Sequence, residues 1–265
     1  MQWVGNTVES HVHVAREKFP RVERYLEDMP LLGISRAALS QNIGNYDNEY
    51  LIEAAKRFPD RFKVIVMLDL ESLTIKEDIA NLKNYPEVVG VRLWANTKAP
   101  GSDDMQIWRE IYESGLVASV RGPVDQIYND YFVKVLTQFP SLKVRIEHLG
   151  SFNFSKDKQA DFDLFMKMAR FKNLHLMWAG FYANSGEDYP YNNSASFLRR
   201  SLEMFGAQRI MWSGDWNADV EHGSLKVCRE SSELFSKRLL LAELLDNDLD
   251  WIMGRTADNF LNWQT

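Results

Sequence analysis

Eight short runs rich in β-branched and aromatic residues alternate along the chain with longer segments of helical pattern, and few folds accommodate such an alternation. The runs are residues 8–14, 37–41, 63–69, 88–94, 116–121, 143–148, 174–178 and 209–213. Alternating strands and helices predict a parallel sheet covered by helices. Eight repeats of this unit predict closure into a single α/β barrel, the (β/α)8 or TIM barrel.

The segments between the runs have the spacing of amphipathic helices and show no domain boundary. In "NEYLIEAAKRF", for example, Leu51, Ala54, Ala55 and Phe58 fall on one helical face. No glycine-rich turn follows an early strand, so the fingerprint of an open dinucleotide-binding sheet is missing. A chain of 265 residues without a linker or low-complexity tract is expected to form one barrel domain over residues 1–265.

The amino-acid composition limits which binding partners and which cellular compartment the protein can have. The net charge of −6 argues against nucleic acid, because such partners require a basic face. A single cysteine, Cys228, excludes an internal disulfide and fits a reducing compartment. The N-terminus lacks the basic start and apolar run of a signal peptide, and no apolar stretch reaches membrane-spanning length. We expect a cytoplasmic protein with a small-molecule substrate and neither a nucleic-acid nor a membrane partner; a homo-oligomer stays open.

Two of the five histidines stand one residue apart in "TVESHVHV", on the first predicted strand. Side chains alternate across a strand, so His11 and His13 point to the same side. If that side is the barrel interior, both imidazoles reach the mouth, where they need a shared partner such as a metal or a bound oxyanion. The alternative is a histidine pair on a half-exposed edge strand.

Two further strand ends carry groups suited to catalysis. In "VRIEHLG", we expect Val144, Ile146 and His148 to share one face, with His148 at the carboxyl end of the strand. In "IMWSGDW", Asp215 follows the eighth strand. Barrel enzymes keep their catalytic groups at these ends. His148 and Asp215 are therefore predicted to meet the histidine pair at one mouth.

With these motifs the chain resembles the amidohydrolase superfamily, in its amidohydrolase-2 branch of decarboxylases and lactone hydrolases. "VESHVHV" resembles the D-x-H-x-H first strand of that branch, "FPSLKVRIEHLG" its sixth strand and "GAQRIMWSGDWN" its eighth. Sugar-lactone and 2-pyrone-4,6-dicarboxylate lactonases are the most similar members. The chain departs from the pattern at Glu9, where the family has Asp, and at Arg121, where metal-dependent members have His. The fourth strand carries Arg92 and no lysine that could bridge two metals.

The resemblance leaves two kinds of site open. If a metal is bound, zinc or manganese, the ligands implied are His11, His13 and Asp215. Lactonases of the pyrone type work without a metal and bind substrate carboxylates through arginine, a role for Arg92 and Arg121. An arginine at position 121 would also repel a divalent ion, so we favour a metal-free site.

The function implied is hydrolysis of a lactone that is anionic or polyhydroxylated. Asp215 is expected to act as general base on water, while the three histidines stabilise the oxyanion. The expected substrate contacts are Arg92, Arg121, Trp94, Ser40 and Trp216. Tyr182 and His222 lie in long loops that could reach the site.

Two alternatives belong to other classes. One is a metal-dependent decarboxylase of an unsaturated or aromatic acid, which the same branch contains. The other is a barrel that binds a ligand without catalysis. The joint presence of the three histidines and Asp215 argues against the second alternative.

Overall fold

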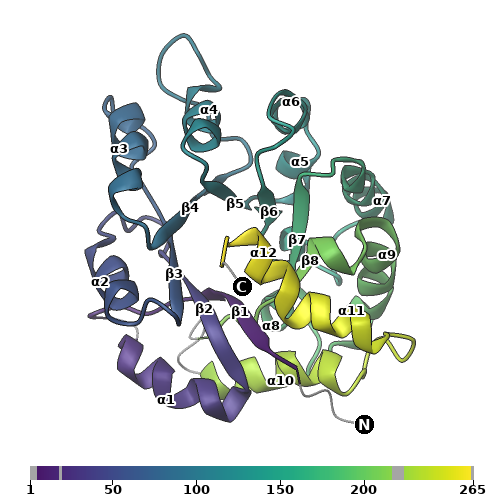
Figure 1. Cartoon of the computed structure of the whole chain (residues 1–265). Coiled ribbons are helices and arrows are strands. Elements are labelled where there is room, and N and C mark those ends of the chain that lie inside the picture. The colour runs from purple at the N-terminus through teal and green to yellow at the C-terminus, as the bar shows by residue number, and fades with distance from the viewer. Residues whose placement is uncertain (1–4, 18–19, 217–223, 264–265) are drawn as a thin grey trace.

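A computed structural model describes residues 5–17, 20–216 and 224–263 and confirms the barrel (Figure 1). The strands are β1 Thr7–Val12, β2 Ile34–Ser40, β3 Phe62–Val66, β4 Val88–Trp94, β5 Val117–Arg121, β6 Val144–Ile146, β7 Leu174–Trp178 and β8 Ile210–Trp212. Each pairs in parallel with the next in chain order. All eight fall on the runs expected from the sequence.

Most of the helices surround the strands on the outside (Figure 1). The longer ones are α1 Val22–Leu32, α2 Glu49–Arg57, α3 Ile75–Asn81, α4 Gln106–Glu113, α6 Asp130–Gln138, α7 Gln159–Lys167, α9 Ala195–Phe205 and α10 Ser224–Ser236; the shorter ones are α5 Val124–Ile127, α8 Phe181–Asn184, α11 Asp246–Asp250 and α12 Thr256–Phe260. In α2 the residues that the sequence placed on one face, Leu51, Ala54 and Ala55, are buried. Within the described part of the chain, every helix is too short or too polar to cross a membrane.

The amino end of the barrel is filled by an apolar plug. Figure 1 shows α12 lying across the centre of the ring of strands. The buried cluster there combines interior residues of the strands with the C-terminal segment: Val8, Ala38, Ile65, Val89, Val117, Met177, Ala179, Met211, Ala257, Phe260, Leu261 and Trp263. Barrel interiors are packed in layers and are not pores. The apolar layer at the amino end therefore contributes stability, and the polar groups of a site are expected at the carboxyl end of the strands.

The first strand changes direction between this plug and the mouth. Val8 belongs to the apolar plug, whereas Glu9 contacts Cys228 of α10 on the helix side of the wall. The β1–β2 register shifts between Glu9 and Val12, and His11 then meets Arg145 of β6 inside the barrel. A bulge of this kind re-aims side chains near an active site. The irregularity of β1 is what brings its histidines inward.

Strand β6 corrects one expectation from the sequence. Val144 and Ile146 pack into the outer core with the helices, while Arg145 and Glu147 point inward, toward Ser119 of β5. His148 nevertheless reaches the mouth, because its φ of 47° ends the extended backbone. The alternation rule holds only along an extended strand, so counting it back from His148 assigned Val144 and Ile146 to the wrong face.

The plug provides a test of this architecture. Phe260 is 1% exposed, and its ring centroid lies 5.0 Å from that of His175. We expect Phe260→Ala to lower the free energy of unfolding by about 3–5 kcal/mol, the usual cost of deleting a buried aromatic ring. Urea unfolding followed by circular dichroism measures this change.

Leu245→Ala is the matched control, because Leu245 precedes α11 with 65% of its surface exposed. Its effect should stay within about 0.5 kcal/mol. A similarly small effect of Phe260→Ala would mean that the barrel does not depend on its C-terminal plug.

Candidate active site

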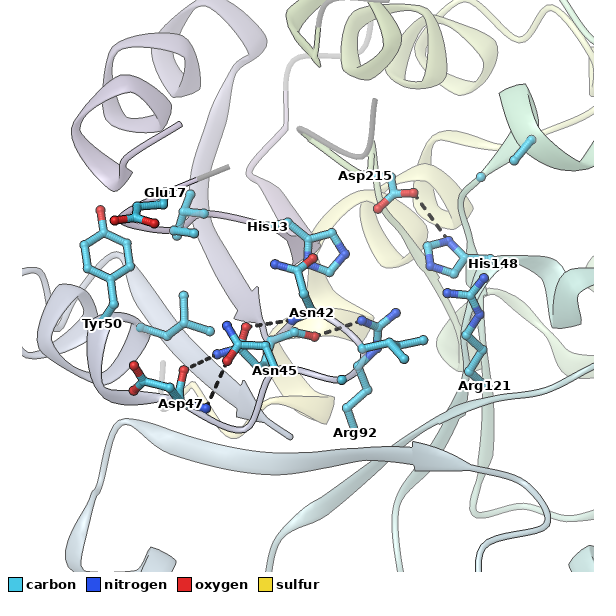
Figure 2. Close-up of a pocket in the computed structure, with 18 of the residues that line it drawn as sticks. His13, Glu17, Asn42, Asn45, Asp47, Tyr50, Arg92, Arg121, His148 and Asp215 are labelled. Atoms are coloured by element: carbon cyan, nitrogen blue, oxygen red, sulfur yellow. Dashed lines mark hydrogen bonds and ion pairs between the residues drawn. The ribbon is translucent and has the colours of Figure 1, made fainter. Parts of the chain in front are cut away.

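A cavity of about 1000 Å³ opens at the carboxyl ends of the strands (Figure 2). Its wall includes His13 after β1, His148 after β6 and Asp215 after β8, together with Arg92 and Arg121. The structure thus brings together groups that are far apart in the sequence, at the end of the barrel that the sequence predicted.

Asp215 is buried in this wall and held by one oxygen. Its backbone has a φ of 54°, and its N–H donates to the Ser213 hydroxyl at 2.9 Å. The Tyr182 hydroxyl donates to Oδ2 at 3.0 Å, and Nδ1 of His148 lies 3.5 Å from the same oxygen. Oδ1 is buried and accepts no hydrogen bond from the described residues. The carboxylate is therefore oriented through Oδ2, and the lone pairs of Oδ1 stay unused by the described residues.

The hydrogen-bond partners of the paired histidines assign their tautomers. Nδ1 of His13 lies 2.8 Å from the carbonyl oxygen of Ser40 and must donate to it. Nη2 of Arg145 lies 3.2 Å from Nδ1 of His11, and because arginine only donates, that nitrogen accepts. A neutral His11 then carries its proton on Nε2 and donates it to Nε2 of His13, 3.1 Å away. Both nitrogens of each ring are engaged.

Both rings are neutral at pH 7. Burial lowers the pKa of His11 well below its ordinary value, and the positive charge of Arg92 adds to this effect. Burial, again with Arg92, lowers the pKa of His13 to about 4. Burial also lowers the pKa of His148, although the neighbouring carboxylates of Asp215 and Glu147 act in the opposite direction. Positive charge at this mouth therefore comes from arginine rather than from histidine.

Arg92 is the first of these arginines, and it is already paired. Its Nε lies 3.0 and 3.1 Å from the two carboxylate oxygens of Glu147, and its Nη2 donates at 2.8 Å. Its Nη1 donates to the carbonyl oxygen of Gln41 at 2.8 Å. The two-pronged face that we expected to hold a substrate carboxylate is thus occupied. Two of the five guanidinium N–H groups are left for a group in the cavity.

Glu147, Arg145 and Ser119 form a buried network that the sequence analysis did not single out. Burial is the largest influence on the pKa of Glu147 and acts to raise it, but the charge of Arg92 and the other charges and hydrogen bonds around the carboxylate together outweigh burial and hold the pKa well below its usual range. The Ser119 hydroxyl donates to Glu147 at 2.6 Å and accepts from Nε of Arg145 at 2.8 Å. Burial lowers the pKa of Arg145 to about 10, so it stays charged at pH 7. The sequence did contain a signal for this network: Arg145 and Glu147 alternate with apolar residues in the sixth strand.

Arg121 lies on the cavity wall without an acidic partner among the described residues. Its Cζ is 5.8 Å from the ring centroid of Trp94, which is 36% exposed. Arginine stacks favourably on an aromatic face, and such stacking leaves its N–H groups free. Of the cations that line the cavity, Arg121 is the one best placed to receive an anionic substituent.

Several expected substrate contacts lie elsewhere. Trp216 is 1% exposed, donates its indole N–H to Asp28 at 3.1 Å and lies outside the described lining of the cavity, as does Trp94. Ser40 acts on His13 through its carbonyl group, and its hydroxyl is buried. His11 is fully buried and lies behind His13. These residues lie near the predicted strand ends, but their side chains are not part of the described lining of the cavity. His222 lies outside the described residues.

The same contacts test whether the site fits a divalent metal. Ligand-type atoms of His11, His13 and Asp215 lie within 4.8 Å of one another, as do those of His11, Glu147 and His148. A zinc site takes lone pairs from at least three protein ligands. In the first set Nε2 of His11 carries a proton, and in the second set Glu147 is paired with Arg92. The residues in this arrangement do not fit such an ion.

Glu9 fastens the end of β8, which carries Asp215. Its carboxylate accepts hydrogen bonds from the backbone of Gly214 at 2.8 Å and of His11 at 3.3 Å, and from the hydroxyl of Ser213. Glycine is required at 214, because a Cβ there would lie 2.1 Å from Sγ of Cys228. Burial raises the pKa of Glu9 to about 7. This acid joins the first and last strands, between which the described chain has no ladder of backbone pairs.

Comparison with known proteins agrees with the barrel fold and shows the family. The model of an amidohydrolase family, Amidohydro_2, matches residues 14–263. An L-fucono-1,5-lactonase of Burkholderia ambifaria is 25% identical over 198 residues, which cover 71% of this chain and 67% of that protein. A candidate 2-pyrone-4,6-dicarboxylic acid hydrolase of Pseudomonas putida has a TM-score of 0.81 and 20% identity, with 98% of both chains covered. An amidohydrolase of Burkholderia multivorans with bound zinc has a TM-score of 0.78 and 14% identity, covering 97% of this chain and 99% of that one.

The raised pKa of Glu9 predicts a pH-dependent stability. In the unfolded chain this carboxyl has its ordinary pKa of about 4.5, so it binds its proton more tightly in the folded protein. Proton binding therefore stabilises the fold at low pH. This contribution is lost as the pH rises through about 7. Between pH 5 and pH 8 the free energy of unfolding should therefore fall by about 2–3 kcal/mol more in the wild type than in Glu9→Gln. Urea titrations at each pH measure the difference.

Glu71→Gln, at an exposed position, is the control and should keep the slope of the wild type. If the wild type and Glu9→Gln lose stability in parallel, the folded protein does not hold a proton on Glu9.

Proposed function

The chain belongs to the amidohydrolase family, and on that premise we propose that it is a hydrolase that opens a lactone ring. The observation that carries the proposal is the state of Asp215. Its carboxylate is anchored through Oδ2 by Tyr182 and presents Oδ1 without a partner among the described residues. This is the arrangement of a general base. The similarity to a fuconolactonase supports the choice of a lactone as substrate.

The reaction uses this base and one arginine. Oδ1 of Asp215 takes a proton from water as the water oxygen attacks the lactone carbonyl carbon. The carbonyl oxygen becomes an oxyanion and receives the N–H groups of Arg92 that Glu147 and Gln41 leave over, with His148 beside it. Collapse of the intermediate breaks the ring C–O bond, and Asp215 returns the proton to the departing alkoxide. The product is a hydroxy acid.

The paired histidines have a different role from the one expected. His13 donates to Ser40 and accepts from His11, so neither ring directs an N–H at a substrate oxyanion. The pair instead forms a neutral, rigid part of the wall next to Asp215. Oxyanion stabilisation therefore rests with Arg92 and His148.

The outer cavity favours a polyhydroxylated substrate. Figure 2 shows Asn42, Asn45, Asp47, Tyr50 and Glu17 on the side away from Asp215. Amide, hydroxyl and carboxylate groups bind sugar hydroxyls well, whereas carboxylates repel a second acidic substituent. With the two-pronged face of Arg92 occupied, this lining suits a sugar lactone with at most one carboxylate better than a pyrone dicarboxylate.

Replacement of the base tests the reaction. We expect Asp215→Asn to reduce kcat by about two to four orders of magnitude, because an amide cannot accept the proton. The fold should survive, since the side chains have nearly the same size. A pH-indicator assay with a panel of sugar lactones measures acid release, and evolution of CO2 from aromatic acids in the same samples would indicate the decarboxylase alternative.

The control for this replacement is Asp60→Asn, at an exposed turn after α2, which should retain full activity. Activity close to that of the wild type in Asp215→Asn would move the base to another residue, with His148 the nearest choice. No turnover of any lactone by the wild type would favour a binding barrel.

Arg121 gives a prediction about specificity. We expect Arg121→Met to raise KM for a lactone that bears a carboxylate by about 10–100-fold, the value of a charge-assisted hydrogen bond. Neutral sugar lactones should be turned over as before. Steady-state kinetics on one neutral and one acidic lactone measures both effects.

Arg16→Met is the control, because Arg16 also lines the cavity but is paired with Glu53 at 2.7 Å. Equal losses for the neutral and the acidic lactone in Arg121→Met would assign Arg121 a structural role only.

A further inference from the structure

Arg145 lies fully buried inside the barrel, against the edge of His11 that faces away from the cavity. We propose that Arg145 is a positioning residue that fixes the tautomers of His11 and His13 and so prevents the pair from binding a divalent cation. The inference goes beyond lactone hydrolysis, because it concerns what the pair can bind whatever the reaction is.

The contact between Arg145 and His11 determines which nitrogen of His11 carries the proton. Nη2 of Arg145 is 3.2 Å from Nδ1 of His11. A guanidinium has no lone pair to offer, so it accepts no hydrogen bond. Nδ1 must therefore be the unprotonated nitrogen, and a neutral ring keeps its hydrogen on Nε2. Histidine ligands normally show the opposite pattern, in which the outer N–H donates to a carboxylate or carbonyl and thereby frees the other nitrogen for the metal.

Further hydrogen bonds hold Arg145 in place. Its Nε donates to the hydroxyl of Ser119 at 2.8 Å, and its Nη1 donates to the carbonyl oxygen of Ser10. The serine hydroxyl is itself turned toward Glu147. Strands β5 and β1 thus hold the guanidinium against His11.

The other potential ligands do not complete a metal site. Nε2 of His13 already accepts the proton of His11 at 3.1 Å, and Nδ1 is bound to the carbonyl oxygen of Ser40. Without His11, only His13 and Asp215 remain from the first ligand set, and an ion there would also face the charge of Arg92, which acts on both rings. Arg121, which the sequence suggested as the residue that repels a metal, lies on the cavity wall over Trp94.

Two substitutions of Arg145 separate the tautomer from the rest of the site. The amide oxygen of Arg145→Gln can accept a hydrogen bond from Nδ1–H, which frees Nε2 of His11 as a ligand. The protonated ammonium of Arg145→Lys only donates, so this variant is the matched control. Zinc affinity is measured by competition with a chromophoric chelator, and cobalt binding by its visible spectrum.

We expect no stoichiometric zinc or cobalt in the wild type or in Arg145→Lys. Arg145→Gln should bind zinc at least about 10–100-fold more tightly, the usual scale of an outer-shell change, and this gain should disappear in the double variant with His13→Ala. One equivalent of tightly held zinc in the wild type, lost in His13→Ala, would overturn the proposal. So would equal affinities of Arg145→Gln and Arg145→Lys when both are folded.

A measurement on the wild type keeps the proposal testable if Arg145→Gln fails to fold. In ¹⁵N-histidine-labelled protein, the nitrogen shifts should show His11 protonated at Nε2 and unprotonated at Nδ1, unchanged by an equivalent of Zn²⁺. A proton on Nδ1 of His11 would contradict the inference. None of these readouts needs a substrate, so their outcome is independent of whether the protein hydrolyses lactones.

Discussion

The arrangement of the mouth depends on the burial of one guanidinium, that of Arg145. Burying an unpaired charge costs several kcal/mol unless hydrogen bonds and opposite charge offset it. Here Ser119, the carbonyl oxygen of Ser10 and His11 satisfy the guanidinium directly. Glu147, bridged through Ser119, supplies the negative charge. Each of these partners is thereby fixed in place, and the orientation of His11 follows from a requirement of the barrel interior rather than from any ligand.

The barrel separates stability from chemistry along its axis. Its lower interior is an apolar layer closed by α12, where truncation costs packing and cavity energy. The interior near the mouth holds the charged network. In these surroundings of low polarity, hydrogen bonds are strong when every group has a partner, and an unpaired group is costly. Between the apolar and the charged layers, the bulge of β1 turns the chain. The side chain of Glu9 therefore binds the backbone at the end of β8, whereas the side chain of His11 points into the barrel. A regular first strand could not supply both.

The sequence predicted the barrel well because strand periodicity reports burial directly. Residues 88–94 and 174–178 agree with β4 and β7 at both ends. The convergence of His13, His148 and Asp215 followed from their places at strand ends, since all ends of a parallel barrel meet at one rim. The predictions that failed concerned the direction in which side chains point and the partners with which they pair. His148 and Asp215 have positive φ values, which end the alternation on which such statements depend. The pairing of Arg92 with Glu147 joins β4 to β6, and no local pattern encodes it.

The choice of arginine over histidine as the source of charge follows from the same burial. Desolvation lowers the pKa of His11, His13 and His148, so an imidazolium would be present only in acid. A guanidinium keeps its proton even where burial lowers its pKa, as in Arg145. The mouth therefore keeps a constant positive charge across the range in which Asp215 must stay ionised to act as a base. The neutral histidines then add shape and directed hydrogen bonds to the wall.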